Sequence, residues 1–228
     1  MATAMRNVPV FLTVRDRVCV VVGGGPVGTR KAAALVEAGA RVTVVTPACS
    51  LEIEDMAAAG RLRLVRRGYR TGDLEGAWLA YAATGVPAVQ DLVASDAERA
   101  RVWLNAVDEP SRCSFTTPAV VERGPITIAI GTGGASPALS GAIRRDLDAW
   151  LGDEYERAVR LLADLRDRHE PGEARQRAFL ALIEGGLLEA LRRGDDGRID
   201  QLVDGAFADV PRRRPAPAEA RVEGAGAR

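Results

Sequence analysis

The sequence is poor in the residues that most often build metal centres and disulfide frameworks. Its 228 residues include one histidine and three cysteines, and Cys19, Cys49 and Cys113 form no C-x-x-C pair. This shortage argues against a preformed zinc or iron site, and no Ser/His/Asp or Cys/His motif supports nucleophilic catalysis. The sparse, odd cysteine count indicates a reducing compartment, so we expect a cytoplasmic protein.

An excess of one charge and long hydrophobic runs are missing as well. The 31 basic and 31 acidic residues cancel, which argues against broad binding to nucleic acid or to an anionic membrane. No apolar run is long enough to span a bilayer, and the N-terminus lacks the core of a signal peptide. Lys31 is the only lysine, and we expect it to be solvated on a helix. His169, at a predicted helix end, is expected at the surface.

The most informative stretch begins with the β-branched run from Val18 to Val22, which predicts a parallel strand buried on both faces. A G-x-G-x-x-G pattern follows directly on Gly23, Gly25 and Gly28. The first glycine permits the tight turn, the second lets a pyrophosphate approach the backbone, and the third lets helix pack on strand. The pattern predicts a dinucleotide site, and a Rossmann-like unit that keeps its glycines for packing alone is the alternative.

The segments after the glycine turn complete a βαβ unit. Residues 29–38 are rich in good helix formers, and residues 41–46 read as the second strand. No Asp or Glu ends this strand, so the ribose of the cofactor must be held by backbone or by Thr46. The usual test therefore does not distinguish NAD from NADP.

Further strands and helices alternate up to residue 107. The pattern predicts strands at 62–65, 78–83 and 103–107 and helices at 50–60 and 87–101. This alternation indicates an α/β fold with a Rossmann-like, doubly wound parallel sheet, which binds ligands beyond the carboxyl ends of its strands. Thr46, Thr84 and the run from Asn105 to Asp108 fall at such ends.

Asp108 is the candidate catalytic residue at this rim. A carboxylate there can accept a proton as a carbon centre is oxidised. The alternative is an Asp that caps the turn before Pro110, and the local sequence by itself slightly favours that role.

The pattern changes beyond Pro110. Residues 115–121 and 125–130 read as two β segments, and amphipathic helices follow from 138 onward. The tail from 211 to 228 lacks periodicity and is expected to be disordered. Near the N-terminus, residues 8–14 read as a short strand or an extended segment that covers the sheet.

The small-residue loop from Gly131 to Pro137 is a second candidate binding element. Its glycines expose backbone N–H groups, and Ser136 with Pro137 suits a helix start that holds a carboxylate or phosphate. A tight strand-to-helix connection without ligand is the alternative. Arg144 and Arg145 follow on the helix and suit anionic groups, although a solvated face is the commoner role of such pairs.

Three stretches together carry a resemblance to a known family. They are VPVFLTVRDRVCVVVGGGPVGTRKAAALVEAGARVTVVTP, WLAYAAT and NAVDEPSRCSFTTPAVVERGPITIAIGTGGASPALSGAIRRDL. In order and spacing they resemble the precorrin-2 dehydrogenase/sirohydrochlorin ferrochelatase module of siroheme synthesis, closely over residues 8–151 and more loosely beyond.

The resemblance implies an activity and roles for single residues. It implies oxidation of precorrin-2 to sirohydrochlorin with NAD⁺ as hydride acceptor. Many members then insert Fe²⁺, and some insert Co²⁺ or lack chelatase activity. Asp108 matches the family's essential aspartate, and cofactor contacts are implied for Pro26, Val27, Pro47 and Ala48, with Thr84 at a neighbouring strand end. For the carboxylate-rich tetrapyrrole, we predict the contact residues Asn105, Arg112, Thr132, Gly133, Gly134, Ser136 and Arg144.

The resemblance also implies a domain plan. It places an NAD-binding Rossmann domain at 1–113, a β/α dimerisation region at 114–151 and a small all-helical domain at 152–210, in a homodimer. Two other classes of function stay open, a tetrapyrrole carrier or chelatase that no longer oxidises and a non-enzymatic NAD-sensing module. The intact glycines and Asp108 speak against the carrier, and a sensor would not need Asp108 or the loop from Gly131.

Overall fold

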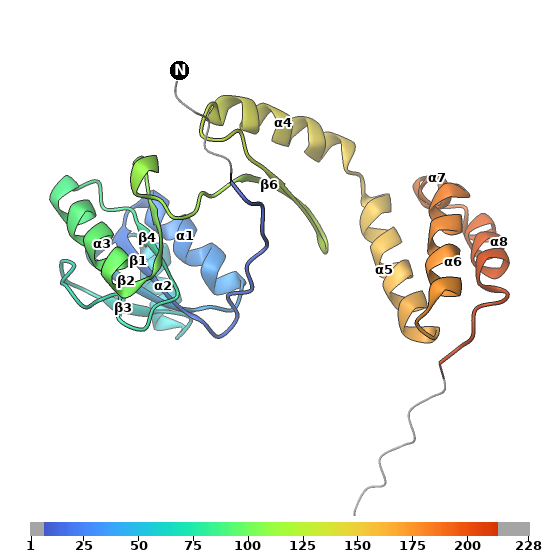
Figure 1. Cartoon of the computed structure of the whole chain (residues 1–228), viewed down its shortest axis with the longest axis horizontal. Helices are drawn as coiled ribbons and strands as arrows, with labels where there is room; N and C mark the ends of the chain where they lie inside the picture. Colours follow the sequence, from blue (N-terminus) through green and yellow to red (C-terminus); the bar gives the residue numbers. More distant parts are fainter. Residues whose placement is uncertain (1–6, 214–228) are drawn as a thin grey trace, which may run out of the picture. The chain divides into compact units, whose positions relative to one another are not determined.

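The computed structural model describes residues 7–213, which divide into two compact units. The first unit comprises the chain up to Pro118 together with Gly133–Ser136. The second comprises Ala119–Thr132 and the chain from Pro137 onward. Figure 1 shows the elements of both units, coloured along the sequence.

The first unit is built on a five-stranded, fully parallel sheet with strand order β3-β2-β1-β4-β5. The strands are β1 (Val18–Gly24), β2 (Arg41–Cys49), β3 (Arg63–Val65), β4 (Leu79–Ala82) and β5 (Trp103–Ala106). The helices are α1 (Pro26–Glu37), α2 (Leu51–Ala58) and α3 (Pro87–Ala100), followed by the short 3₁₀ turn η1 (Pro110–Arg112). The predicted Rossmann-like fold class is confirmed.

Two hydrophobic cores cover the two faces of this sheet, because successive residues of a strand point to opposite sides. Cys19 and Val21 of β1 pack with residues of α1 and α2, whereas Val20 and Val22 pack with residues of α3. All four side chains are at most 2% exposed, which explains the unbroken apolar run of this strand.

Several boundaries differ from the sequence prediction. The first helix begins at Pro26 and not at Thr29, since proline suits the first helical position and Gly25 takes the extended conformation before it. The second strand continues to Cys49, which pairs with Gly24 after an irregularity in the register. The glycine turn is therefore flanked by the extended end of β2.

The prediction of a strand or a sheet-covering segment at residues 8–14 is wrong. The segment pairs with no strand, and Val8, Val10 and Phe11 are between 62% and 82% exposed. Only Val14 enters the first core, just before the turn at Asp16 that leads into β1.

The second unit combines a β-hairpin with five helices among the described residues. The hairpin strands β6 (Ala119–Arg123) and β7 (Ile126–Ile130) are antiparallel. The helices are α4 (Pro137–Trp150), α5 (Asp153–Arg168), α6 (Glu173–Glu184), α7 (Leu187–Arg193) and α8 (Asp196–Phe207). A third core, which includes Leu182 and Leu187, is formed by residues of α5, α6, α7 and α8. Figure 1 shows these four helices.

His169 is buried, and the expectation of a surface position is wrong. Its ring lies 4.6 Å from that of Phe207, and its Nδ1 is 2.9 Å from the carbonyl oxygen of Leu165. The chain returns at Arg212 and Arg213, whose pairing with Arg168 and His169 encloses the ring. Residues 211–213 of the predicted disordered tail are thus ordered, and the rest of it lies outside the described residues.

Lys31 is half-buried, so the expectation of a solvated side chain is also wrong. Its Nζ lies 5.1 Å from the centre of the Tyr81 ring, at the distance of a cation–π contact. Burial, and to a smaller extent the neighbouring charge of Arg30, lowers the pKa of this ammonium. The helix face that carries Lys31 is turned toward β4 and not toward water.

Within residues 7–213, no helix has both the length and the apolarity that a membrane crossing requires. All three cysteines are free thiols.

The thiols are expected to differ widely in reactivity. Cys19 is fully buried, and burial raises its pKa to about 11, so little thiolate exists at pH 8. We predict that iodoacetamide modifies Cys19 at least about 100-fold more slowly than the partly exposed Cys49. Peptide mass spectrometry along a labelling time course measures both rates, with guanidine-unfolded protein as the control. Equal rates in the native protein would contradict the buried position of Cys19.

Candidate functional site

The glycine turn brings three chain segments into contact that side chains would hold apart. Gly23 has φ +114°, and a Cβ built on it would lie 2.2 Å from the carbonyl oxygen of Ala83. A Cβ on Gly28 would lie 2.1 Å from the carbonyl oxygen of Gly23. These two predicted glycines therefore serve the packing of the turn against the end of β4 and of α1 against the turn.

Gly25 differs from the other two because open space surrounds it. A Cβ on Gly25 would meet no atom within 4 Å, and its φ of −75° is accessible to any residue. Gly25 precedes α1 without a side-chain cap, and no acidic residue occupies the first turn of this 12-residue helix. This start of α1, with Pro26 and Val27, fits a pyrophosphate, because helix N-terminal N–H groups and the helix dipole favour anions.

The end of β2 lies against the same turn. A Cβ on Gly24 would lie 2.5 Å from the carbonyl oxygen of Ala48, and both Pro47 and Ala48 are exposed. Thr46 is buried, and its hydroxyl donates to the carbonyl of Ala48 over 2.6 Å. Thr46 therefore shapes the end of the strand, and Pro47 and Ala48 follow it at the surface.

A charged pair that the sequence did not reveal lies beside Cys49. Arg66 donates to Glu54 over 2.8 Å, and both side chains are 3.9 Å from the Cys49 sulfur. Glu54 belongs to α2 and Arg66 follows β3, so the pair joins two elements next to the end of β2. No local motif signals this pair, because its members are 12 residues apart in the chain.

A cavity of about 280 Å³ opens between the carboxyl ends of β4 and β5. Its lining consists of Gly85, Pro87, Gln90, Val107, Asp108 and Glu109. Asp108 is exposed and has φ +63°, a left-handed conformation that is uncommon for residues other than glycine. Thr84, one residue before the lining, receives the N–H of Val86 on its hydroxyl over 3.1 Å and so organises the start of α3.

The turn that carries Asp108 is tied to α3. Gln90 donates from Nε2 to the carbonyl of Val107 over 3.1 Å and to Glu109 over 3.3 Å. Arg112 contacts the other oxygen of Glu109 over 2.5 Å and also pairs with Asp91. Arg112 was predicted to bind anionic substrate groups, but two carboxylates already neutralise it in this structure.

The side chain of Asn105 in β5 also contacts other residues of the chain. Its amide donates to the carbonyl of Phe115 over 2.9 Å and lies 3.7 Å from the sulfur of Cys113. The amide therefore holds the segment that leaves η1. Sequence reasoning missed Gln90 altogether, because a glutamine within a helix carries no motif.

The remaining predicted substrate residues fall into different units. Gly133, Gly134 and Ser136 belong to the first unit, as Asp108 does, whereas Thr132 and Arg144 belong to the second. Gly133 and Gly134 both have positive φ, +61° and +81°, so the loop needs glycine at these positions.

No cluster of three metal-ligating side chains occurs in the described part of the chain.

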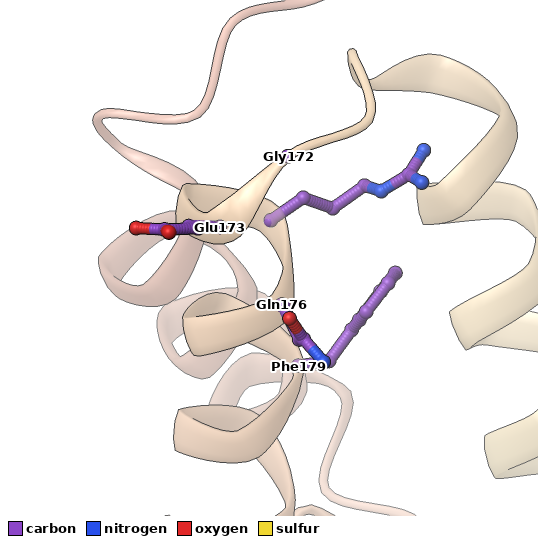
Figure 2. A pocket seen from close by; sticks show the side chains of 5 residues that line it. Gly172, Glu173, Gln176 and Phe179 are labelled. Atoms are coloured by element: carbon purple, nitrogen blue, oxygen red, sulfur yellow. The ribbon is translucent and has the colours of Figure 1, made fainter.

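A larger cavity of about 490 Å³ lies in the helical unit at the start of α6, next to Gly172 and Phe179 (Figure 2). In Figure 2 the carboxylate of Glu173 points away from Gln176 and Phe179. Nearby Arg175 donates to the carbonyls of Arg166 and His169, so it ties α5 to α6. This cavity contains none of the predicted site residues.

The chain is similar to several known proteins. Residues 10–119 match a family described as "Putative NAD(P)-binding". The chain is 36% identical over 230 residues to a siroheme synthase of Methylococcus capsulatus, covering 97% of this chain and 48% of that protein. It is 39% identical over 164 residues to siroheme synthase 2 of Cronobacter sakazakii, covering 72% of this chain and 36% of that protein.

A solved structure is similar over nearly the whole chain. The structure of SirC, a precorrin-2 dehydrogenase, superimposes with a TM-score of 0.75 at 26% identity, covering 89% of this chain and 100% of SirC. By contrast, this chain spans about half the length, or less, of the siroheme synthases that it matches. The resemblance found in the sequence is confirmed, and the chain belongs to the family formed by the N-terminal module of siroheme synthases and the SirC precorrin-2 dehydrogenase.

Proposed function

We propose that this protein is an NAD-dependent precorrin-2 dehydrogenase that forms sirohydrochlorin in siroheme synthesis, in the cytoplasm. The observation that carries the proposal is Asp108, an exposed carboxylate in a left-handed turn at a cavity beyond the strand ends. The glycine turn follows β1 and Asp108 follows β5, and β4 pairs with both strands in the parallel sheet. The proposed cofactor site and the carboxylate therefore both lie beyond the carboxyl ends of the strands. The similarity to SirC adds support.

The proposed cofactor site uses residues that leave room for a dinucleotide. Gly25, Pro26 and Val27 would hold the pyrophosphate at the start of α1, and Pro47 and Ala48 would lie along the adenosine half. NAD⁺, when bound, supplies a hydride acceptor.

Asp108 is the proposed general base. Oxidation of precorrin-2 removes two electrons and two protons as one hydride and one proton, so the proton needs an acceptor. The Asp108 carboxylate accepts it at a side-chain oxygen and releases it to solvent, to which the residue is exposed. Fe²⁺ or Co²⁺ is proposed as a further substrate, with Asp108 accepting pyrrole protons during metal insertion.

Backbone N–H groups and arginines would bind the carboxylates of the tetrapyrrole. We assign this role to Thr132, Gly133, Gly134 and Ser136 and to Arg144 of α4. Arg112 acts differently in this proposal. Because Asp91 and Glu109 neutralise it, Arg112 braces the turn of Asp108 and is not a free receptor for anions.

We further propose a homodimer built on the hairpin and α4. A two-stranded hairpin needs further cover to be stable, and Ile126, Ile128 and Ile130 are only half-buried within one chain. In the amphipathic α4 only Ser140 is buried, while Leu139 and Trp150 are more than half exposed. A second copy that covers these apolar side chains would supply the missing burial.

Replacing Asp108 tests the proposed base. In anaerobic assays with precorrin-2 and NAD⁺, Asp108→Asn should lower kcat by about 10²- to 10⁴-fold, because the amide cannot accept the proton. The affinity for NAD⁺, measured by calorimetry, should stay within about twofold of wild type because Asp108 lies outside the pyrophosphate cradle. Wild-type protein that binds NAD⁺ but forms neither NADH nor sirohydrochlorin would favour a sensing or carrier module.

Gly25→Ala tests the proposed pyrophosphate site at the start of α1. The added methyl group enters open space, so thermal stability should be unchanged, but it fills the approach to the start of α1. We expect the dissociation constant for NAD⁺ to rise about tenfold or more. Gly205→Ala in α8, where a Cβ also meets nothing within 4 Å, is the matched control and should bind normally. Unchanged affinity in Gly25→Ala would remove the cofactor from this position.

The dimer is tested by light scattering after size exclusion. Wild-type protein should have twice the chain mass of 24.2 kDa. Ile130→Glu, which places a charge on the half-buried face of the hairpin, should shift the protein toward one chain mass. Thr127→Glu lies on the exposed face of the same strand and should leave the dimer intact. A wild-type monomer at micromolar concentration would refute the proposed assembly.

A further inference from the structure

Asp108 has a left-handed backbone conformation, which is uncommon for residues other than glycine, although Asp adopts it more readily than most. A left-handed backbone costs a non-glycine residue free energy, and it persists where the surroundings hold it. Apart from Asp108, only Asp16 and Arg101 have positive φ among the described non-glycine residues. Of these three, Asp108 lines the cavity beyond the ends of β4 and β5.

One side chain touches the residues on both sides of Asp108. The Nε2 of Gln90 donates to the carbonyl of Val107 and to the carboxylate of Glu109. Gln90 lies in the first turns of α3 and is only 5% exposed, so surrounding atoms restrict its movement. A single buried amide therefore spans the turn.

The orientation of this amide follows from its partners. Both partners of Nε2 are oxygen acceptors, so a flipped amide would place its own oxygen against two others. Oε1 of Gln90 must then point elsewhere, and it is the only buried side-chain N or O atom without a hydrogen-bond partner in the described residues. A buried acceptor without a partner costs stability. The Gln90 side chain thus donates two hydrogen bonds to the turn while its own Oε1 accepts none.

A second tie joins the same helix to the same turn. Asp91, the next residue of α3, pairs with Arg112, which in turn contacts Glu109. This pair is largely solvent-exposed, with Asp91 59% exposed at its side chain, and exposed ion pairs contribute little. The buried amide of Gln90 is therefore the stronger of the two ties.

We propose that Gln90 is a positioning residue that holds Asp108 in its left-handed conformation by bridging the two residues beside it. This inference rests on the proposed function, in which Asp108 is the base. When the bridge is lost, the turn relaxes toward an ordinary conformation and the carboxylate moves away from the substrate. Misplacement of a catalytic group by about 1 Å costs up to about 100-fold in rate.

The test is a set of Gln90 variants assayed with precorrin-2 and NAD⁺. Gln90→Met keeps the volume and removes both donated hydrogen bonds, and kcat should fall about 10- to 100-fold. The dissociation constant for NAD⁺ and the melting temperature should stay near wild type, since the variant also removes the unpaired oxygen. Gln90→Glu places an oxygen against both acceptors and should lower kcat at least as much. Gln176→Met, at an exposed glutamine of α6, is the control.

The double variant separates positioning from a general structural role. If Gln90 acts through Asp108, adding Gln90→Met to Asp108→Asn should lower kcat no further, because residues that act as a unit are not additive. Backbone ¹³Cα and ¹³Cβ shifts of Asp108 report the left-handed conformation without any turnover, and Gln90→Met should move them. Wild-type kcat and unmoved shifts in Gln90→Met would overturn the inference, even where Asp108→Asn is inactive. If wild type itself has no activity, the proposed function fails while the shifts still decide the role of Gln90.

Discussion

The close approach of backbone to backbone at the glycine turn is the constraint on which the first unit depends. Gly23 lies against the end of β4, and Gly28 lies against Gly23, at separations that leave no space for a Cβ. This contact holds α1 against β1 and brings the end of β4 beside the turn. Pairing of β4 with β5 then places the start of the Asp108 turn at the same edge of the sheet. The close packing at Gly23 and Gly28 thus brings the proposed cofactor site and the turn of Asp108 to the same edge of the sheet.

The turn that carries Asp108 is connected to the buried sheet through α3. The strand ends are buried and hydrogen-bonded within the sheet, and α3 is anchored to them through its core residues Val93 and Ala97. From this helix a buried amide and an exposed ion-pair network extend to the turn that carries Asp108. Such an arrangement places an exposed carboxylate on a preorganised support, which is what a base acting on a large ligand requires.

The second unit combines a well-buried helical core with elements whose apolar side chains are only partly covered. Its helices α5 to α8 share a compact core, and the aromatic pair of His169 and Phe207 closes it where the chain returns. The hairpin and α4, in contrast, leave apolar side chains half covered within one chain. Hydrophobic surface of this kind is typical of an interface, so within this one unit a self-sufficient helical core adjoins elements suited to assembly.

The sequence by itself determined the order of strands and helices, the glycine turn and the position of Asp108 after a buried strand, because these features depend on neighbours a few residues apart. Periodicity and turn chemistry are local, and so they survive in the sequence. Hydrogen bonds and ion pairs between side chains carry no comparable sequence signal, because most of them join residues of different elements. Only the tertiary structure decided that Gln90 spans the Asp108 turn and that Arg112 is neutralised by Asp91 and Glu109. It likewise decided that His169 is buried and that the segment at 8–14 pairs with no strand, since burial and strand pairing depend on which distant surfaces fold together.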